Sequence, residues 1–399
     1  MKTSTDASPS WRVWLALISL SVGSFASVMT EFLPVGILPK VIGDFGITAG
    51  QAGFMMTLPG LLAAFSAPFA LMASGRTDRK FTLIGLSLLL LVSILMAAWA
   101  PSYPVLLFSR ALSGISLGAF WATAFVVAGH LVGSRNARTG VAMVFAGVTA
   151  AMILGVPLGT YMASLFNWRI AFLATAAIAA VSLLLQIVYL PRISPDKPLK
   201  VAALIAFARN PAAHKSLALI VLIFVTHFGT YTYLTPLLNQ AGLHDGLLTT
   251  TLFSFGIAGF IANFVASATI HRHLIATLAG VLLLFIVSLA ALVTLDGMYS
   301  LFLAVTGWGI AWGALPLCLN IFNRQADESR VEASSAMFIF TGQLSIAAGS
   351  AAGGVVVDSL GTRADLVSGG VLLVLSLLLL WFWRPGRKPH ARECTDAAL

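Results

Sequence analysis

Twelve apolar runs, each long enough to cross a lipid bilayer, recur along almost the whole chain. A helix needs about 20 predominantly apolar residues to span ~30 Å of hydrocarbon. The sequence therefore predicts an all-α integral membrane protein with twelve transmembrane helices. The runs cover residues 13–38, 50–73, 81–99, 104–131, 137–165, 168–190, 216–238, 247–270, 274–295, 299–322, 333–357 and 366–383.

The composition supports this prediction. Charged residues make up 9% of the chain and hydrophobic residues 59%, whereas about 25% of the residues in an ordinary globular domain are charged. A chain with so few charges cannot cover itself with a water-facing surface. The first run is too long for a secretory signal, and no small-residue cleavage site follows it, so we expect it to be a helix.

The distribution of Lys and Arg indicates the orientation in the membrane. With the N-terminus placed inside, nineteen of the 23 Lys and Arg fall on the inner side, and three, Lys40, Arg169 and Arg363, fall on the outer side. Cationic loops are retained on the cytoplasmic side during insertion, so both termini are predicted to be cytoplasmic. The net charge of +9 is then a topology signal, and no nucleic-acid binding is expected from it.

Two charged residues interrupt the apolar runs. Arg110 is the one cation that this count leaves over, and Glu31 is the only acid that lies clearly inside a span. Glu31 precedes Pro39 by eight residues and Arg110 follows Pro104 by six, so the two charges are predicted at similar depths, ~12 Å and ~9 Å from the outer face. A charge inside a membrane is costly unless it is paired or faces water, so both residues are functional candidates.

The chain also repeats itself. At an offset of 195 residues, "SGISLGAF" (113–120) aligns with "WGIAWGAL" (308–315), and the same offset aligns Gly147 with Gly342. We therefore predict two pseudo-symmetric six-helix bundles and, by analogy with transporters, a substrate site near the midplane between them. The predicted units are an N-terminal half (1–190), a cytoplasmic linker rich in Pro and cations (191–215), a C-terminal half (216–385) and a cytoplasmic tail (386–399).

This layout and several motifs resemble the major facilitator superfamily, and within it the twelve-helix drug and proton antiporters. The loop "ALMASGRTDRKFTL" resembles the superfamily's loop motif, although Gly75 stands at the usual Asp position and Asp78 at that of the second Gly. Such a cluster can pair with helix C-termini, with Asp78 or with lipid phosphates, and so hold one state of a gate. The alternative is a positive-inside anchor without a switching role. The gate residues are Arg76, Asp78, Arg79 and Lys80.

Two further motifs of this family occur in the fourth and fifth predicted helices. "RALSGISLGAFW" resembles the helix 4 motif, and the resemblance implies that Arg110 tunes proton exchange; the alternative is an Arg that extends outward to the membrane surface. "GVTAAMILGVPLG" resembles the helix 5 antiporter motif, in which small residues allow a close helix contact and a Pro bends the helix. The matching residues are Gly147, Gly155, Pro157 and Gly159. Together the motifs favour exchange over uniport.

Glu31 lies in "FASVMTEFLPVGILP", where "TEF" and a following Pro resemble helix 1 of the bacterial sugar efflux (arabinose-exporter-like) branch. The resemblance implies that this acid takes up protons. Burial favours its neutral form and a nearby Arg favours its charged form, so it is expected to exchange protons as the cavity wets and dries. The alternative is a permanent ion pair with Arg110 that holds the first and fourth helices together.

Polar and aromatic residues of the spans are candidates for substrate binding. His227 lies twelve residues, ~18 Å, after Lys215 and therefore near the midplane, and Tyr231 follows it by one turn. A buried His is otherwise a hydrogen-bonded interior residue, and the aromatic residues are otherwise packing or lipid contacts. The further candidates are Trp121, Trp308, Trp312, Asn263, Asn320 and Gln343.

The sequence predicts a transporter driven by an ion gradient and not an enzyme. It contains no G-x-x-x-x-G-K-[ST] phosphate loop and no H-E-x-x-H site, so no cofactor and no metal is expected. We predict a proton-coupled exporter of small molecules, namely sugars, sugar analogues or amphiphilic drugs, in a bacterial inner membrane. Its partners are substrate, protons and lipid, and we expect a monomer. The alternatives are an uncoupled facilitator and a membrane sensor without transport.

Overall fold

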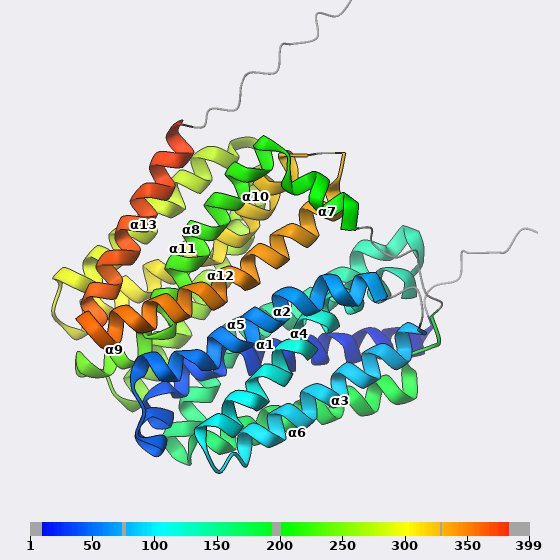
Figure 1. Cartoon of the computed structure of the whole chain (residues 1–399), viewed down its shortest axis with the longest axis horizontal. Coiled ribbons are helices and arrows are strands. Elements are labelled where there is room, and N and C mark those ends of the chain that lie inside the picture. The colour runs from blue at the N-terminus through cyan, green and yellow to red at the C-terminus, as the bar shows by residue number, and fades with distance from the viewer. Residues whose placement is uncertain (1–9, 74–76, 194–200, 328, 383–399) are drawn as a thin grey trace, which may run out of the picture.

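The computed structural model of the chain describes residues 10–73, 77–193, 201–327 and 329–382. These residues form helices joined by short turns (Figure 1). The N-terminal half contains α1 (Trp11–Phe45), α2 (Ala49–Ala73), α3 (Arg79–Ala98), α4 (Tyr103–Leu131), α5 (Gly133–Leu165) and α6 (Trp168–Tyr189). After the short α7 (Val201–Ala208) come α8 (Pro211–Thr232), α9 (Leu234–Gln240), α10 (Asp245–Thr294), α11 (Met298–Gln325), α12 (Val331–Leu360) and α13 (Thr362–Phe382).

Twelve segments of these helices are long and apolar enough to cross a membrane, which confirms the predicted all-α membrane fold. Each predicted run overlaps one of them. The eighth and ninth runs both fall within α10, where His273 has non-helical angles (φ −137°, ψ 44°) and marks the break between two spans. The prediction for the first run ended too early, because α1 continues through Pro34 and Pro39 to Phe45.

The helix ends follow from local sequence. Asn167 accepts a hydrogen bond from the Ile170 amide and caps α6, and Asp78 caps α3 in the same way through the Lys80 amide. These side chains satisfy amides that a helix start leaves unpaired. Glycine ends a helix in a different way. The C-terminal end of α1 is capped by Gly46, whose φ of 63° lies in the left-handed region, where a residue without Cβ is favoured. Such stops allow the short turns between spans.

The helices form two bundles that lie side by side, one of α1–α6 and one of α8–α13 (Figure 1). We call the end of the molecule where α1 begins the inner end, and the end where α1 stops the outer end. Helix α2 packs against α12, and α5 packs against α10, across the boundary between the bundles. The site discussed below lies at this boundary.

The sequence repeat reappears as matched packing in the two bundles. Gly114 of α4 lies against the backbone of α2, and its counterpart Gly309 of α11 lies against the backbone of α10. The next pair behaves alike, since Gly118 faces α2 and Gly313 faces α10. A Cβ at any of these positions would overlap the facing helix. The aligned glycines therefore make equivalent helix contacts, as pseudo-symmetric halves require.

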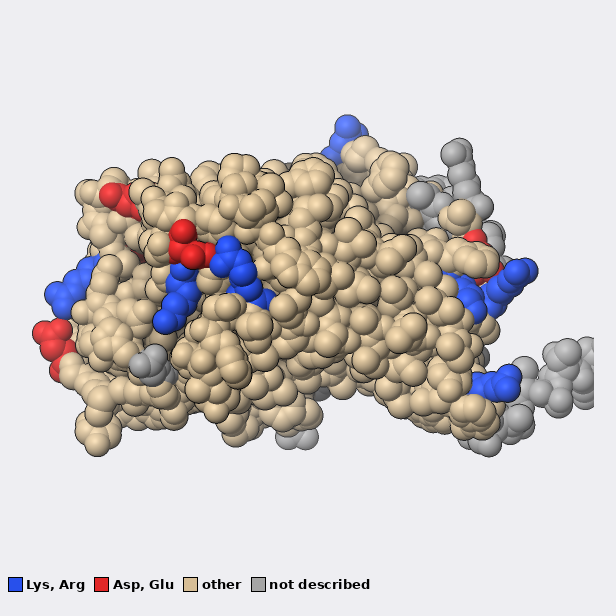
Figure 2. Space-filling view, turned by 90° about the horizontal axis from the view of Figure 1, so that it is seen from below, with Lys and Arg blue, Asp and Glu red and all other residues tan. Residues whose placement is uncertain are grey.

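The outer surface fits a bilayer. On the face shown in Figure 2, Lys, Arg, Asp and Glu gather mainly toward the two ends, and most of the surface between them is uncharged. Large apolar side chains are exposed on many spans, among them Leu184, Val287 and Val371. In water such a surface would be unfavourable, whereas hydrocarbon solvates it.

Candidate functional site

The two embedded charges meet at the same depth, as predicted. The Arg110 guanidinium on α4 donates from Nη2 to the backbone carbonyl of Glu31 on α1 (3.2 Å) and from Nε to the carbonyl of Met55 on α2 (3.0 Å). Only 1% of Arg110 is exposed. The side chain therefore joins three helices inside the N-terminal half and does not extend outward to the membrane surface.

The Glu31 carboxyl has no hydrogen-bond partner in the described part of the chain. It is 3% exposed, and both of its oxygens are buried and unpaired. The predicted alternative of a permanent ion pair with Arg110 is therefore wrong for this conformation, because the guanidinium binds backbone carbonyls instead. Arg110 Nη1 likewise has no hydrogen-bond partner in the part of the chain that the structure describes. A buried polar group without a partner is unfavourable unless water, a ligand or a proton satisfies it.

Gln343 brings the C-terminal half to this carboxyl. Its side chain on α12 lies beside Glu31 without a hydrogen bond of normal geometry, and its own Oε1 is unpaired. The residue after Glu31, Phe32, stacks its ring on Phe228 of α8, with ring centroids 5.7 Å apart. The unpaired carboxyl is thus located where the two bundles touch.

His227 lies within an aromatic cluster on the other side of this boundary. Its ring stacks on Trp312 with centroids 3.4 Å apart, and on Tyr231 at 4.9 Å. The indole of Trp308 donates to His227 Nδ1 (3.1 Å), so this nitrogen carries no proton, and Nε2 remains for other interactions. The interior hydrogen bond expected for a buried His is present, and contact of His227 with substrate stays a prediction.

The other predicted substrate residues are spread along the boundary. Trp121 on α4 is half-buried, and its indole N–H is unpaired. Asn263 on α10 donates to the Gly313 carbonyl of α11 (3.0 Å) and so supports helix packing. Asn320 lies half-buried on α11. The structure therefore brings Gln343 to Glu31, and Tyr231 and Trp312 to His227, but it places Asn263 in a separate groove.

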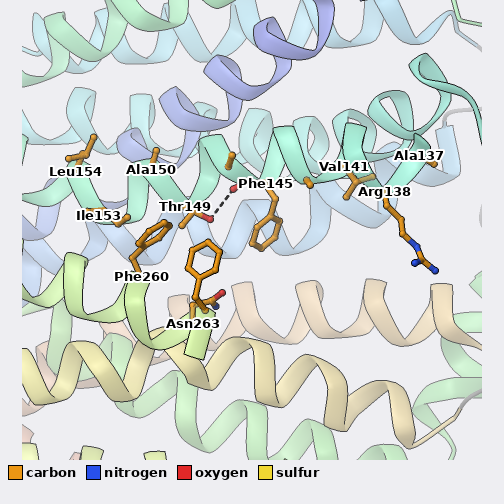
Figure 3. Close-up of a pocket in the computed structure, with 13 residues that line it drawn as sticks. Ala137, Arg138, Val141, Phe145, Thr149, Ala150, Ile153, Leu154, Phe260 and Asn263 are labelled. Carbon is orange, nitrogen blue, oxygen red and sulfur yellow. Dashed lines mark hydrogen bonds between the residues drawn. The ribbon is translucent and has the colours of Figure 1, made fainter. Parts of the chain in front are cut away.

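This groove separates α5 from α10 over their inner parts and has a volume of about 930 Å³. Figure 3 shows its wall on α5 from Leu154 to Ala137, with Phe260 and Asn263 on the facing helix and Arg138 toward the inner end. Its lining is mainly apolar. A volume of this size accommodates a small-molecule ligand. The groove lies between the two bundles on the inner side.

The predicted antiporter helix packs closely on α1. A Cβ at Gly147 would overlap the Ser21 carbonyl, Gly155 faces Met29, and a Cβ at Gly159 would overlap the Leu33 side chain. Pro157 lies inside α5. The small residues therefore permit the close contact that the motif predicts, and they hold the helix that carries Glu31 against the helix that lines the groove.

Asp78 and Lys80 of the predicted gate loop contact their own half. The Asp78 carboxylate accepts from the amides of Lys80 (2.9 Å) and Ile193 (3.1 Å), and Lys80 Nζ donates to the Ile187 carbonyl near the end of α6 (3.1 Å). Arg79 is buried. A cation at a helix C-terminus is favourable. Arg76 lies outside the described residues, and the gate role of the loop stays a prediction.

At the outer end the two bundles are joined through Asp358, which the sequence did not single out. This α12 side chain accepts from the Gly50 amide (2.9 Å) and the Thr48 hydroxyl (2.6 Å), both at the start of α2. An acid at a helix N-terminus accepts hydrogen bonds from the free amides, and its negative charge interacts favourably with the helix dipole. The C-terminal half thus caps a helix of the N-terminal half on the outer side.

Replacing Asp358 with Ala is expected to favour opening at the outer end. An exposed cap contributes about 0.5–1 kcal/mol, so the population ratio should change roughly two- to fivefold. Spin labels at the outer ends of α2 and α12 should then report more long distances. Asp296→Ala is the matched control, because Asp296 pairs with Arg363 (3.1 Å) within the C-terminal half. An equal change in both variants would exclude a specific cap.

A second buried acid also escaped sequence reasoning. Asp365 lies in the first turn of α13 and is 4% exposed, so Glu31 is not the only acid buried in a span. The predicted run began one residue later, at 366. An acid in the first turn is a common structural feature because the helix dipole stabilises it. This position gives Asp365 a structural explanation that the mid-helix Glu31 lacks.

Comparison with known proteins gives consistent results. The sequence profile of the Major Facilitator Superfamily matches residues 20–350. The purine ribonucleoside efflux pump NepI of Escherichia coli strain K12 is 30% identical over 372 residues, which cover 92% of this chain and 93% of the relative. The transcription regulatory protein OpdE of Pseudomonas aeruginosa is also 30% identical, with 92% of each chain covered.

Solved structures share the fold at low sequence identity. A mutant of the nucleoside transporter NupG superposes with a TM-score of 0.74 at 13% identity, covering 94% of this chain and 99% of that chain. The human organic anion transporter MFSD10 gives a TM-score of 0.66 at 19% identity, covering 94% of this chain and 100% of that chain. These likenesses confirm the predicted architecture.

Proposed function

Because this chain belongs to the Major Facilitator Superfamily, whose members are transporters and not enzymes, we propose that it is a proton-coupled exporter. Inward proton movement through Glu31 would drive outward movement of a small molecule. The observation that carries this proposal is the buried Glu31 carboxyl, which is unpaired where the two halves meet. A carboxyl without a fixed partner can change its protonation state when the halves move and water reaches it.

Alternating access requires that the two ends open in turn. At the outer end, Asp358 caps α2 across the boundary, while the groove between α5 and α10 extends over the inner part of the boundary. This arrangement supports an inward-facing state. In that state a substrate would enter through the groove, and the unpaired Glu31 would release its proton to the inner side.

We infer that the substrate combines a sugar with a planar ring, as purine ribonucleosides do. The support is the 30% identical efflux pump NepI, whose name gives that class. Gln343 and Glu31 also offer acceptors for hydroxyl or amino donors, and these acceptors have no partner among the described residues. The predicted sugar efflux branch and amphiphilic drugs remain competing proposals.

The proposed location is a bacterial inner membrane with both termini cytoplasmic. The excess of Lys and Arg on one side supports the orientation, and the relative NepI supports a bacterial efflux protein. Lipid surrounds the apolar belt, and the proposed working unit is a monomer. Neither a nucleic acid nor a cofactor takes part in this scheme, because the proton gradient supplies the free energy.

A counterflow assay with purified protein in liposomes tests the substrate proposal. Vesicles loaded with an unlabelled purine ribonucleoside should take up the labelled compound transiently, and unlabelled arabinose or chloramphenicol should compete weakly. Efficient competition by arabinose would favour the sugar class.

The relative OpdE supports a second candidate, a membrane sensor without transport. If nucleosides, sugars and drugs all fail in counterflow but a ligand still raises the thermal stability of the protein, that candidate gains support.

A further inference from the structure

Polar groups without protein partners continue from Glu31 toward the inner end of α1. The hydroxyl oxygens of Ser24 and Ser27 are buried and have no hydrogen-bond partner among the described residues, and these two residues are 0% and 1% exposed. They precede Glu31 by seven and four residues. Positions with this spacing lie on one face of a helix, so the two hydroxyls and the carboxyl form a row along α1.

Other buried hydroxyls of the same helix behave differently. Ser19 donates to the Ala16 carbonyl (2.6 Å) and Thr30 to the Ala26 carbonyl (2.7 Å). This bond to the preceding turn is the usual way for a Ser or Thr in an apolar helix to satisfy its hydroxyl. Ser24 and Ser27 do not make it. Since buried polar groups are normally paired with protein or with ordered water, their hydroxyls require another partner.

The spacing of the row suits water. With a rise of 1.5 Å per residue, Ser24 and Ser27 are ~4.5 Å apart along the helix axis, and Ser27 and Glu31 are ~6 Å apart. One water between two oxygens, bonded to each at about 2.8 Å, spans roughly 5.6 Å. Single waters can therefore connect neighbouring members of the row, and each would find the two or more polar partners that a buried water needs.

The outer end of the row adjoins a further polar atom that has no partner among the described residues. At its outer end are the Glu31 carboxyl and Arg110 Nη1, and Arg110 is the charged side chain that acts on this carboxyl. At its inner end, Gly23, the residue before Ser24, lies against the ring of Phe120 on α4.

We propose that a file of water molecules runs along the Ser24, Ser27 and Glu31 face of α1 toward the inner end, and that Ser24 and Ser27 are positioning residues that hold it. This file connects the carboxyl with the inner side while Asp358 keeps the outer end closed. A proton released by Glu31 passes to the first water and leaves along the file. The proton-conducting role of the file rests on the proposed proton coupling, whereas the presence of water along this face of α1 does not.

The hydration is tested by cysteine labelling of the full chain in membranes. Ser24→Cys and Ser27→Cys are compared with Ser19→Cys and Thr30→Cys, in a background without Cys318 and Cys394. Methanethiosulfonate reagents react with the thiolate form of a cysteine. Apolar burial raises the thiol pKa, and each unit of increase lowers the thiolate fraction about tenfold. We expect Ser24→Cys and Ser27→Cys to react roughly tenfold faster or more than the two controls. Equal, slow labelling at all four positions would overturn the proposal.

The proton role is tested with the double variant Ser24→Ala/Ser27→Ala. We expect efflux driven by a pH gradient to slow about fivefold or more, while substrate counterflow keeps its KM. The matched double variant Ser19→Ala/Thr30→Ala should leave both rates unchanged. A raised counterflow KM with an unchanged driven rate would mean that the serines contact substrate, and it would overturn the proton role. Wild-type protein without any gradient-driven efflux would refute the proposed coupling instead, and the labelling result would stand separately.

Discussion

Glu31→Gln is expected to abolish export driven by a pH gradient and to leave folding and counterflow largely intact. Gln is nearly isosteric with a protonated Glu but cannot release a proton. The wild-type carboxyl makes no hydrogen bond to any residue that the structure describes, so the replacement should be tolerated structurally. The measurement is substrate efflux from liposomes with and without an imposed pH gradient. We expect the gradient-dependent part to fall to the level of empty liposomes.

Asp365→Asn is the matched control for this variant, because Asp365 is also an acid in a spanning helix and is also nearly inaccessible. It lies in the first turn of α13, so its replacement should lower stability somewhat without removing the coupling. If Glu31→Gln retained wild-type gradient-driven efflux, Glu31 would not be the proton carrier. If Asp365→Asn alone lost the coupling, the carrier would belong to the C-terminal half.

Arg110→Ala is expected to move the pH profile of export upward. The guanidinium is buried beside Glu31, and a cation stabilises a neighbouring carboxylate. An opposite charge within ~4–6 Å commonly changes the titration of a carboxyl by about one to three pH units. Without Arg110 the acid stays protonated to higher pH, so the midpoint of gradient-driven efflux should rise by about one unit or more.

Arg110→Lys separates charge from geometry in this prediction. Lys keeps the positive charge but lacks the planar fork with which Arg110 reaches the Glu31 and Met55 carbonyls. We expect it to restore part of the wild-type profile. Arg110 would be excluded from the mechanism if both variants exported with an unchanged pH dependence and only the yield of folded protein fell.

Much of the fold was predictable because membranes impose a simple rule on sequence. Every spanning run follows from length and apolarity, and the repeat offset correctly matched Gly114 with Gly309 as packing residues. The end of α1 was misplaced because the predicted run stopped at residue 38, before Pro39, whereas Pro is tolerated in membrane helices when neighbouring groups satisfy the freed carbonyl and α1 continues to Phe45. The start of α13 was misplaced because a polar first turn lowers hydropathy.

The site was predictable only in part. The depths of Glu31 and Arg110 follow from residue counting, and their proximity was found as predicted. Which atoms they contact could not be predicted, since Arg110 reaches a carbonyl on α2 and Gln343 approaches from a helix in the other half of the chain. The contact of Asp358 with Gly50 has the same origin. The contacts of Gln343 and Asp358 depend on how the two bundles meet, and that of Arg110 depends on how α1, α2 and α4 pack together, which no local pattern encodes.

The most direct test of proton-coupled export uses vesicles with an acidic lumen. They are either everted membrane vesicles that contain the wild-type protein or liposomes into which the purified wild-type protein has been reconstituted. A labelled purine ribonucleoside supplied outside should accumulate in the lumen above its external concentration while protons leave. A protonophore should reduce the accumulation to simple equilibration. Accumulation only to the external concentration, at the same rate with and without the pH gradient, would contradict the account and identify an uncoupled facilitator.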